Sequence, residues 1–367
     1  MSLRTRKIVG EGFEYPVELH EDFSAIPEKL QSLGKISKIF VCTNREIAGI
    51  YEKYLVKELK KLGIPFHFIY LKPGEKNKHI DRVKKVYHEL IKEEADRNSL
   101  LIAFGGGVIG DFVGFIAATF LRGVRFVQIP TTLLACVDSS VGGKVAVNVD
   151  LGKNMVGAFY QPQFVYAPIF TLRTLPEREW SCGLAEIVKH SFLKGGDYFQ
   201  KISQSKRNEY LPGSDLLLDA IDGSVQIKSE VVSQDEKEGG IRAILNLGHT
   251  TGHAIESLTQ YKKYSHGEAV AIGIVTALLL SKEILNFSKD YFLQAISIMK
   301  SLELPTDLSE KPENILKHME HDKKKDGSEI KFVLLSDFGA SKYGVPISRD
   351  RILKTLMEHK SGAFYGQ

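Results

Sequence analysis

The first half of the chain alternates short apolar runs with longer amphipathic runs, and this alternation limits the possible folds more than any other feature. Runs rich in Ile, Val, Leu and Phe occupy residues 38–42, 65–71, 100–104 and 125–130. Stretches with helical spacing of apolar residues lie between them, as at 80–94 and 108–120. Uninterrupted apolar strands joined by helices are typical of a parallel sheet that is covered on both faces. We therefore expect an α/β, Rossmann-like N-terminal domain with a parallel sheet.

The second half has a different pattern. Beyond about residue 176 strand signals nearly vanish, and helical patterns such as 269–285 and 291–302 replace them, with one strand-like run at 330–335. A chain of 367 residues is long enough for two domains. We expect an α/β domain over residues 1–175 and a mostly α-helical domain over residues 176–367.

Charge and cysteine content narrow the class of function. The formal charge of +4 comes from 49 basic and 45 acidic residues, which is too balanced for a dedicated nucleic-acid binder and favours a small anionic partner. The three cysteines, Cys42, Cys136 and Cys182, form no C-x-x-C pair, so neither a disulfide framework nor a thiolate zinc site is indicated. No apolar stretch is long enough to cross a bilayer. We expect a cytoplasmic protein with neither a nucleic-acid nor a membrane partner.

A glycine-rich loop, GGGVIGD at residues 105–111, follows one predicted strand and opens a predicted helix. Glycines at such a turn let the backbone approach a pyrophosphate, and the helix N-terminus supplies N–H donors. The usual acidic residue about 20 positions later is absent, because residues 125–127 are Arg, Phe and Val. The alternative is a tight turn without a ligand. Residues 73–78 and 43–44 also follow strand ends, where doubly wound sheets hold their ligands.

Histidines in the second half indicate a metal site. His249 and His253 are four residues apart, so in a helix they project from one face; a third histidine, His266, and an upstream carboxylate, Glu186, could complete a three-ligand site. Only one histidine of the pair need bind the metal, and the other is then free to act as an acid or base. One carboxylate and two imidazoles suit Zn²⁺ or Co²⁺ and leave positions open for substrate oxygens. The alternative is a buried polar pair without a metal.

Further polar residues accompany these candidates. Solvation explains most single lysines, but Lys189 is three residues from Glu186 and would share its helix face, and Lys228 interrupts an apolar stretch. His190 is expected either to support a site residue without binding the ligand itself or to be structural. The whole group comprises Asp138, Lys144, Lys153, Asn154, Lys189, Lys228, Glu238, Arg242 and Asn246.

These segments together closely resemble the 3-dehydroquinate synthase family of the sugar phosphate cyclase superfamily. The resemblance runs from about residue 40 to 335, and its most specific pieces are residues 105–111, 129–144, 152–162, 183–189, 246–256 and 266–271. It implies a lyase that depends on NAD and on one divalent metal ion, Zn or Co. Such an enzyme belongs to the shikimate pathway, which supplies chorismate for aromatic amino acid biosynthesis.

The family reaction converts 3-deoxy-D-arabino-heptulosonate 7-phosphate into 3-dehydroquinate and phosphate. It proceeds through transient oxidation by NAD, phosphate elimination, re-reduction and intramolecular aldol closure. Another sugar-phosphate cyclase and a metal-dependent polyol dehydrogenase are the alternative enzymes, and a sugar-phosphate sensor is the alternative without catalysis. Gly143, Lys144 and Arg242 match the dehydroquinate pattern rather than that of the other cyclases.

The resemblance also implies roles for individual residues. It makes Glu186, His249 and His266 the metal ligands and His253 the proton acceptor. Residues around the carbohydrate ring and its carboxylate would be Asp138, Lys189, Lys228, Glu238, Arg242 and His253. Residues facing the phosphate would be Lys144, Asn154, Asn246 and Lys324, together with Arg122 from a neighbouring subunit, so a homodimer is expected.

The expected cofactor contacts lie mainly in the first half of the chain. They are Asn44, Glu75, Lys78, Gly107, Val108, Asp111, Thr131, Thr132, Lys144, Lys153, Thr171 and Thr174. The family commonly has an acid where this chain has Asn44. An amide can still accept a hydrogen bond from a ribose hydroxyl group, but it carries no charge.

Overall fold

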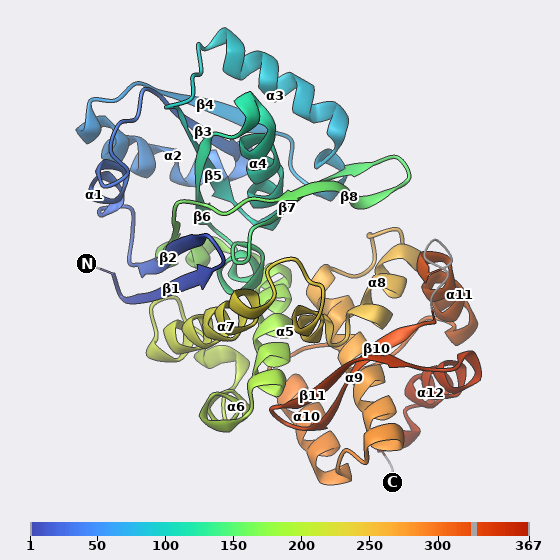
Figure 1. The fold of residues 1–367 in the computed structure, drawn as a ribbon. Helices are drawn as coiled ribbons and strands as arrows, with labels where there is room; N and C mark the ends of the chain where they lie inside the picture. Colours follow the sequence, from blue (N-terminus) through green and yellow to red (C-terminus); the bar gives the residue numbers. More distant parts are fainter. Residues whose placement is uncertain (1, 324–328, 366–367) are drawn as a thin grey trace. The chain divides into compact units, whose positions relative to one another are not determined.

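The computed structural model describes residues 2–323 and 329–365, and Figure 1 shows its fold. The chain forms two compact units. Unit 1 contains Met1–Leu175 and Pro212–Glu236, and unit 2 contains Pro176–Leu211 and Lys237–Gln367. The predicted boundary after residue 175 is one of three places where the chain passes between the units. The segment Pro212–Glu236, however, belongs to the first unit and not to the second as the prediction had it.

Unit 1 is built on a seven-stranded sheet with the order β1-β2-β9-β6-β5-β3-β4. The pairs from β2 to β4 are parallel, and only β1 runs antiparallel to its neighbour. The strands are β1 Arg4–Gly10, β2 Phe13–His20, β3 Ile39–Asn44, β4 Phe66–Leu71, β5 Leu100–Gly105, β6 Arg125–Pro130 and β9 Val165–Pro168. A separate hairpin pairs β7 Lys144–Val149 with β8 Gly152–Phe159.

Helices cover both faces of this sheet. They are α1 Ile26–Gln31, α2 Arg45–Leu59, α3 Ile80–Lys92, α4 Gly107–Thr119 and α7 Asp215–Gln234. Successive strand residues enter different cores: Phe40 packs with side chains of α3 and α4, whereas Val41 packs with α1 and α2. A strand that is buried on both faces must be apolar at every position, which explains the uninterrupted apolar runs.

Helix α7 joins unit 1 because it packs on β1. Two arginines of β1 form ion pairs with it: Arg4 contacts Asp219 at 3.1 Å, and Arg6 pairs with Asp222. The helical periodicity of this segment was recognisable in the sequence, but its packing partner lies more than 200 residues earlier in the chain.

Unit 2 is mostly helical. Its helices are α5 Glu177–Lys194, α6 Gly196–Ser203, α8 His249–Leu258, α9 His266–Leu285, α10 Lys289–Ser301, α11 Pro312–Lys323 and α12 Arg349–Ser361. An antiparallel hairpin of β10 Lys331–Asp337 and β11 Ala340–Pro346 accompanies them. Short helical turns of both units lie at Lys60–Leu62, Glu75–Asn77, Phe120–Arg122, Ala135–Ser139, Ile169–Thr174, Arg207–Glu209, Ile241–Asn246 and Ala363–Tyr365.

The predicted fold class, a Rossmann-like α/β domain followed by a mostly helical one, is confirmed. The prediction missed β1, β2, β9, β11 and the β7–β8 hairpin. In β8 most side chains are exposed or half-buried, so the strand lacks the apolar run that marked the buried strands. Among the described helices, none combines the length and apolar character that a bilayer crossing requires.

Candidate metal centre and nucleotide loop

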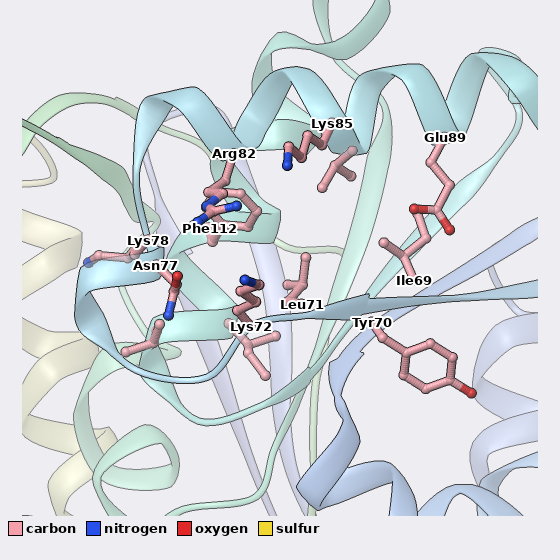
Figure 2. A pocket seen from close by; sticks show the side chains of 13 residues that line it. Ile69, Tyr70, Leu71, Lys72, Asn77, Lys78, Arg82, Lys85, Glu89 and Phe112 are labelled. Atoms are coloured by element: carbon pink, nitrogen blue, oxygen red, sulfur yellow. The ribbon is translucent and has the colours of Figure 1, made fainter.

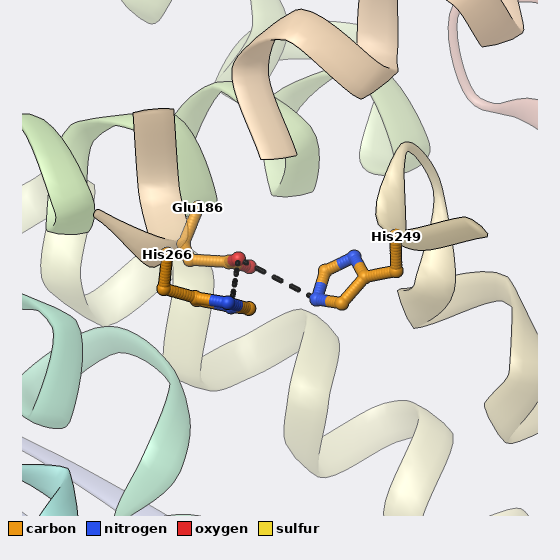
Figure 3. A group of neighbouring side chains, drawn as sticks. All are labelled: Glu186, His249 and His266. Atoms are coloured by element: carbon orange, nitrogen blue, oxygen red, sulfur yellow. Dashed lines mark ion pairs between the residues drawn. The ribbon is translucent and has the colours of Figure 1, made fainter. Parts of the chain in front are cut away.

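Three helices of unit 2 bring the predicted metal ligands together. Glu186 lies in α5, His249 is the first residue of α8, and His266 is the first residue of α9. Nε2 of His249 lies 3.8 Å from Oε1 of Glu186, and Nε2 of His266 lies 3.6 Å from the same oxygen. Figure 3 shows the carboxylate joined to each of the two imidazole rings by a dashed line that marks an ion pair.

The spacing of these donor atoms fits a bound divalent ion. Ligands at about 2.1 Å from a tetrahedral zinc ion are about 3.4 Å from one another. The distances of 3.6 and 3.8 Å in the cluster are close to that value. One buried carboxylate with two imidazole nitrogens is a donor set for Zn²⁺ or Co²⁺, and three protein ligands leave room for a substrate.

Glycines allow the three helices to approach closely enough to form this cluster. A Cβ on Gly273 of α9 would lie 2.0 Å from the carbonyl oxygen of Gly248, the residue before His249. A Cβ on Gly267 would lie 2.3 Å from Cα of Cys182, which is one turn before Glu186 in α5. His249 therefore follows, and His266 precedes, a glycine at a backbone contact between two helices.

Burial and neighbouring charges shift the pKa values of His249 and His266. Lys189 forms a buried ion pair with Glu186. Burial, and next the Lys189 ammonium group, lower the pKa of His249 well below its usual value. Burial would also lower the pKa of His266, but hydrogen bonds to Glu186 and Glu256 outweigh it and raise that pKa to about 10. The protein thus holds His249 neutral, which is the form that binds a metal.

His253 lies beside the cluster and is more exposed than His249 and His266. It occupies the same face of α8 as His249, and their ring centroids are 5.3 Å apart. Its ring centroid lies 6.2 Å from that of His266. The three-residue group around Glu186 does not include His253. This placement agrees with the expected separation of ligand and proton acceptor, while the role of His253 stays a prediction.

The segment before α8 carries three other predicted site residues. The turn Ile241–Asn246 contains Arg242, which is buried, and Asn246. The side-chain amide of Asn246 donates a hydrogen bond of 2.9 Å to Glu238. Asn246 and Glu238 therefore hold each other's side chains in place within unit 2.

The glycine loop of unit 1 has the predicted context. It connects β5 to α4, whose N-cap is Gly106. A Cβ on Gly106 would lie 2.9 Å from the side chain of Thr132, and a Cβ on Gly107 would lie 2.6 Å from Ser139. The backbone N–H of Thr131 also donates to the carbonyl oxygen of Gly105. The two threonines therefore adjoin the loop, where backbone donors of the first turn of α4 can receive a pyrophosphate.

Lys78 connects several of the predicted contacts in unit 1. Its ammonium group is 2.7 Å from Asp111, 2.7 Å from the amide oxygen of Asn154 and 3.6 Å from Glu75. Burial would lower the pKa of Lys78, but Asp111 and Glu75 outweigh it and raise that pKa. Lys78 is thus charged, and it orders residues from the loop after β4, from α4 and from the β7–β8 hairpin.

The other predicted residues of unit 1 lie in four places. The side chain of Asn44 caps α2 by accepting a hydrogen bond from the N–H of Ile47. Thr171 and Thr174 both contact the hydroxyl group of Tyr51. Lys144, at the start of β7, and Arg122, after α4, are exposed, and Lys153 in β8 is half-buried. Val108 is half-buried in the first turn of α4.

Asp138 and Lys228 form a pair within unit 1. Nζ of Lys228, from α7, is 2.7 Å from Oδ1 of Asp138 and also donates to the Asp138 carbonyl oxygen. Lys228 is almost fully buried, so its interruption of the apolar pattern reflects this pairing. Lys324, the last predicted phosphate contact, lies outside the described residues.

A cavity of about 230 Å³ borders the predicted cofactor contacts (Figure 2). It lies between β4, α3 and α4, with Ile69, Leu71 and Phe112 among its apolar walls. Lys78 and Val108 also line it, so it adjoins the glycine loop. No member of the metal cluster contributes to it.

Three further residues, which the sequence did not single out, contact the candidate sites. Glu256 contacts His266, Asn148 connects Glu75 with Asn154, and Tyr51 contacts Thr171 and Thr174. Glu256 had a recognisable signal, because it lies seven residues after His249 and thus on the same helix face. The other two had none, since Glu75 is 73 residues from Asn148 and Thr171 is 120 residues from Tyr51.

Comparisons with known proteins cover most of the chain. A family profile described as 3-dehydroquinate synthase N-terminal matches residues 68–182, and one described as 3-dehydroquinate synthase C-terminal matches residues 183–325. The chain is 54% identical to the 3-dehydroquinate synthase of Leptospira interrogans serogroup Icterohaemorrhagiae serovar copenhageni (strain Fiocruz L1-130). That match covers 94% of this chain and 95% of the relative.

Two solved structures are similar to this fold. A 2-deoxy-scyllo-inosose synthase in complex with carbaglucose-6-phosphate, NAD⁺ and Co²⁺ matches with a TM-score of 0.87 at 26% identity, over 97% of this chain and 100% of that one. A 2-epi-5-epi-valiolone synthase from Streptomyces hygroscopicus subsp. jinggangensis 5008, with NAD⁺ and Zn²⁺ bound, matches with a TM-score of 0.87 at 22% identity, over 97% of this chain and 99% of that one.

Proposed function

The chain belongs to the 3-dehydroquinate synthase family, and from that premise we propose how its residues carry out the reaction. The enzyme converts 3-deoxy-D-arabino-heptulosonate 7-phosphate into 3-dehydroquinate and phosphate, and is a lyase dependent on NAD and a divalent metal ion. The observation that carries the proposal is the cluster of Glu186, His249 and His266, whose donor atoms have the spacing of an open metal site.

When bound, NAD supplies reversible hydride transfer and the metal ion supplies Lewis acidity toward a substrate hydroxyl group. Glu186, His249 and His266 would hold the ion. His253 would accept the proton of that hydroxyl group, because its imidazole is exposed and lies on the ligand-bearing face of α8. Lys189, paired with Glu186, keeps a positive charge beside the carboxylate ligand.

Arg242 and Asn246, in the turn before α8, can bind the anionic groups of the substrate. The guanidinium group of Arg242 can bind a carboxylate through two parallel hydrogen bonds. Asn246 is already oriented by its bond to Glu238. Asp138 and Lys228 form the corresponding polar pair of unit 1 and would face the carbohydrate ring.

Unit 1 would bind the cofactor and would supply part of the phosphate contacts. Backbone donors at Gly107 and Val108, at the start of α4, would receive the pyrophosphate, and the charged Lys78 would keep Asp111 and Glu75 in place. Further cofactor contacts would be Asn44, Thr131, Thr132, Lys144, Lys153, Thr171 and Thr174. Lys144, Asn154 and Asn246 would hold the phosphate; residues that hold both ends of one flexible substrate lower the entropic barrier to ring closure.

The test is a single assay that follows phosphate and NADH together. Purified enzyme with NAD, Zn²⁺ or Co²⁺ and 3-deoxy-D-arabino-heptulosonate 7-phosphate should release phosphate with no net NADH, because the hydride returns to the substrate. Accumulation of one NADH per turnover would identify a polyol dehydrogenase instead. Ligand binding without turnover would identify a sensor.

Two histidine variants separate the roles within the metal site. His249→Ala should lose bound metal and turnover together, since it removes a ligand. His253→Ala should keep its metal and lose rate in the oxidation step, because only the proton acceptor is gone. Metal content by atomic emission and single-turnover hydride transfer are the measurements; full metal content in His249→Ala would refute the ligand assignment.

A homodimer is part of the proposal, with Arg122 completing the phosphate site of its partner. Large apolar side chains are exposed near Arg122 and in the β7–β8 hairpin. Leu121, next to Arg122, is 41% exposed, and Leu151 and Met155 in the β7–β8 hairpin are 86% and 61% exposed. Such side chains are common at subunit interfaces. Arg122→Ala and Lys144→Ala should each be inactive alone.

Mixed after joint refolding or coexpression, these two variants should recover about one quarter of wild-type activity, because half of the dimers are mixed and each has one intact site. A mixture that stays inactive would contradict a shared site.

A further inference from the structure

Glu256 lies at the metal cluster but has no role in the proposed reaction. It lies in α8 seven residues after His249 and three after His253, so all three side chains are on one helix face. Its carboxylate is almost fully buried, and Oε2 lies 3.3 Å from Nδ1 of His266. The other nitrogen of that ring, Nε2, is 3.6 Å from Glu186. The His266 imidazole is thus held between two carboxylates.

We infer that Glu256 is a positioning residue that fixes the tautomer and orientation of His266 for metal binding. An imidazole that donates Nδ1–H to an acceptor has its lone pair on Nε2. With Glu256 as that acceptor, the lone pair of His266 faces Glu186 and the centre of the cluster. This inference rests on the proposed metal site, since the roles of Glu186 and His266 as ligands are part of that proposal.

The second histidine ligand shows the same arrangement with a different acceptor. Nδ1 of His249 is 3.2 Å from the backbone carbonyl oxygen of Leu247, so its Nε2 also faces Glu186. A carbonyl group is neutral, whereas the carboxylate of Glu256 is charged and increases the basicity of the ligand that it contacts. Each ligand therefore has its own orienting group, and only that of His266 contributes charge.

That charge affects the whole cluster. Lys189 neutralises Glu186 through their ion pair, so the two ligand histidines and this pair together carry no net charge when both imidazoles are neutral. Glu256 adds a negative charge next to His266, which favours a divalent cation over an empty site. A carboxylate at this place should therefore strengthen metal binding beyond its effect on ring orientation.

Helix packing keeps Glu256 at its place. A Cβ on Gly252, one turn before Glu256, would lie 3.1 Å from the carbonyl oxygen of Ala269 in α9. A Cβ on Gly273 would collide with Gly248, as described above. These contacts hold α8 against the start of α9, where His266 lies.

A direct metal bond from Glu256 is the competing interpretation. His253, Glu256 and His266 form a second group whose potential ligand atoms lie within 4.8 Å of one another. That group would need Nδ1 of His266 and the exposed His253, whereas the group around Glu186 uses Nε2 of both His266 and His249 and has two buried members. The orienting role is therefore the better explanation, and the experiment below distinguishes the two.

The experiment measures metal affinity without substrate. Metal-free wild-type protein, Glu256→Gln and Glu256→Ala are titrated with Zn²⁺ against a chromophoric chelator, and the Co²⁺ forms are compared by visible absorption. Glu256→Ala should bind Zn²⁺ about 10–100-fold more weakly, as expected for loss of an acceptor behind a ligand histidine. Glu256→Gln should lose less, because its amide oxygen can still accept the hydrogen bond from Nδ1. Thermal unfolding confirms that each variant is folded.

Glu89→Gln is a matched control, because Glu89 also contacts a histidine, His67 at 3.0 Å, but belongs to unit 1, whereas the proposed metal ligands belong to unit 2. It should bind Zn²⁺ like the wild type. Wild-type affinity in Glu256→Ala would overturn the inference. The Co²⁺ spectrum of Glu256→Ala could instead show that the ion has lost one ligand, as expected for His249→Ala. Glu256 would then be a direct ligand, and the inference of a positioning role would also be overturned. A wild-type protein that binds no metal would instead refute the proposed site itself.

Discussion

At the scale of single residues, buried histidines of unit 2 illustrate how surroundings decide protonation. His266 faces two carboxylates, and its pKa is raised to about 10. The hydrogen-bond partners of His359, in α12, are neutral: Nε2 is 2.8 Å from the carbonyl oxygen of Thr306, and Nδ1 is 2.8 Å from the hydroxyl group of Thr276. Because Nε2 must donate to the carbonyl group, Nδ1 accepts from Thr276, and burial lowers the pKa of His359 to about 4.

His359 is expected to make the stability of the protein depend on pH. The unfolded chain binds a proton at this residue near pH 6.5 and the folded chain only near pH 4. The contribution of His359 to the free energy of unfolding is therefore complete above pH 6.5. It is lost as the pH falls from 6.5 to about 4. Two to three pKa units correspond to roughly 3 kcal/mol.

Urea unfolding at pH 7.5, 5.5 and 4.5 checks this dependence. His359→Gln cannot titrate, so its unfolding free energy should fall less over this range than that of the wild type, although it is lower at pH 7.5. Equal slopes for the two proteins would contradict the assignment.

At the scale of elements, the metal cluster depends on the close packing of α8 and α9. Helix α9 is buried along nearly its whole length, and the first turn of α8 contacts its middle. Gly248 begins this contact in a left-handed conformation with φ of 81°, which a side chain would strain. The two histidines of the proposed metal site are the first residues of these two helices, so the distance between the helices determines the distance between the histidines.

Gly273→Ala tests this dependence. The added methyl group would lie 2.0 Å from the carbonyl oxygen of Gly248, so the helices must separate. We expect a loss of about 1–3 kcal/mol in unfolding free energy, typical of overpacking, and weaker Zn²⁺ binding. Chemical denaturation and chelator competition measure the two effects.

Gly49→Ala is the control for this substitution. Gly49 lies within α2 and is exposed, and a Cβ on it would meet nothing within 4 Å beyond its own helix backbone. Alanine there should stabilise the protein by about 0.5–1 kcal/mol, because glycine is unfavourable inside a helix. Unchanged Zn²⁺ affinity in Gly273→Ala would mean that the helix contact does not set the ligand spacing.

At the scale of the whole molecule, the predicted site residues divide between the two units. The glycine loop, Lys78 and the Asp138–Lys228 pair belong to unit 1, and the metal cluster with Arg242 belongs to unit 2. Lys228 reaches unit 1 because the chain returns there for α7. The predicted cofactor contacts therefore all belong to unit 1, and the predicted metal ligands all belong to unit 2.

This division predicts that cofactor binding and metal binding can be lost separately. Asp111→Asn removes the charged partner of Lys78, so NAD binding should weaken about 10-fold, as expected for a charged hydrogen bond, while Zn²⁺ binding is unchanged. His249→Ala should lose Zn²⁺ and keep its affinity for NAD. Calorimetric titrations of each ligand into substrate-free protein are the measurement; joint loss of both ligands in either variant would contradict the division.

The sequence by itself determined the parallel sheet, the glycine loop after β5 and the pairing of His249 with His253 on one helix face. Each of these depends on residues close together in the chain, and hydrophobic periodicity reports such local relations directly. The ligand group of Glu186, His249 and His266 followed from the family resemblance, because periodicity alone left both histidines of α8 as candidate ligands.

Only the tertiary structure decided that α7 belongs to unit 1, that Asn148 connects Glu75 with Asn154, and that Glu256 contacts His266. These relations join residues of different elements, and they depend on how closely backbones approach. Glycines such as Gly273 permit that approach, but the sequence does not reveal which backbone lies opposite them. Side-chain packing between distant segments therefore completed a site whose local parts were already visible.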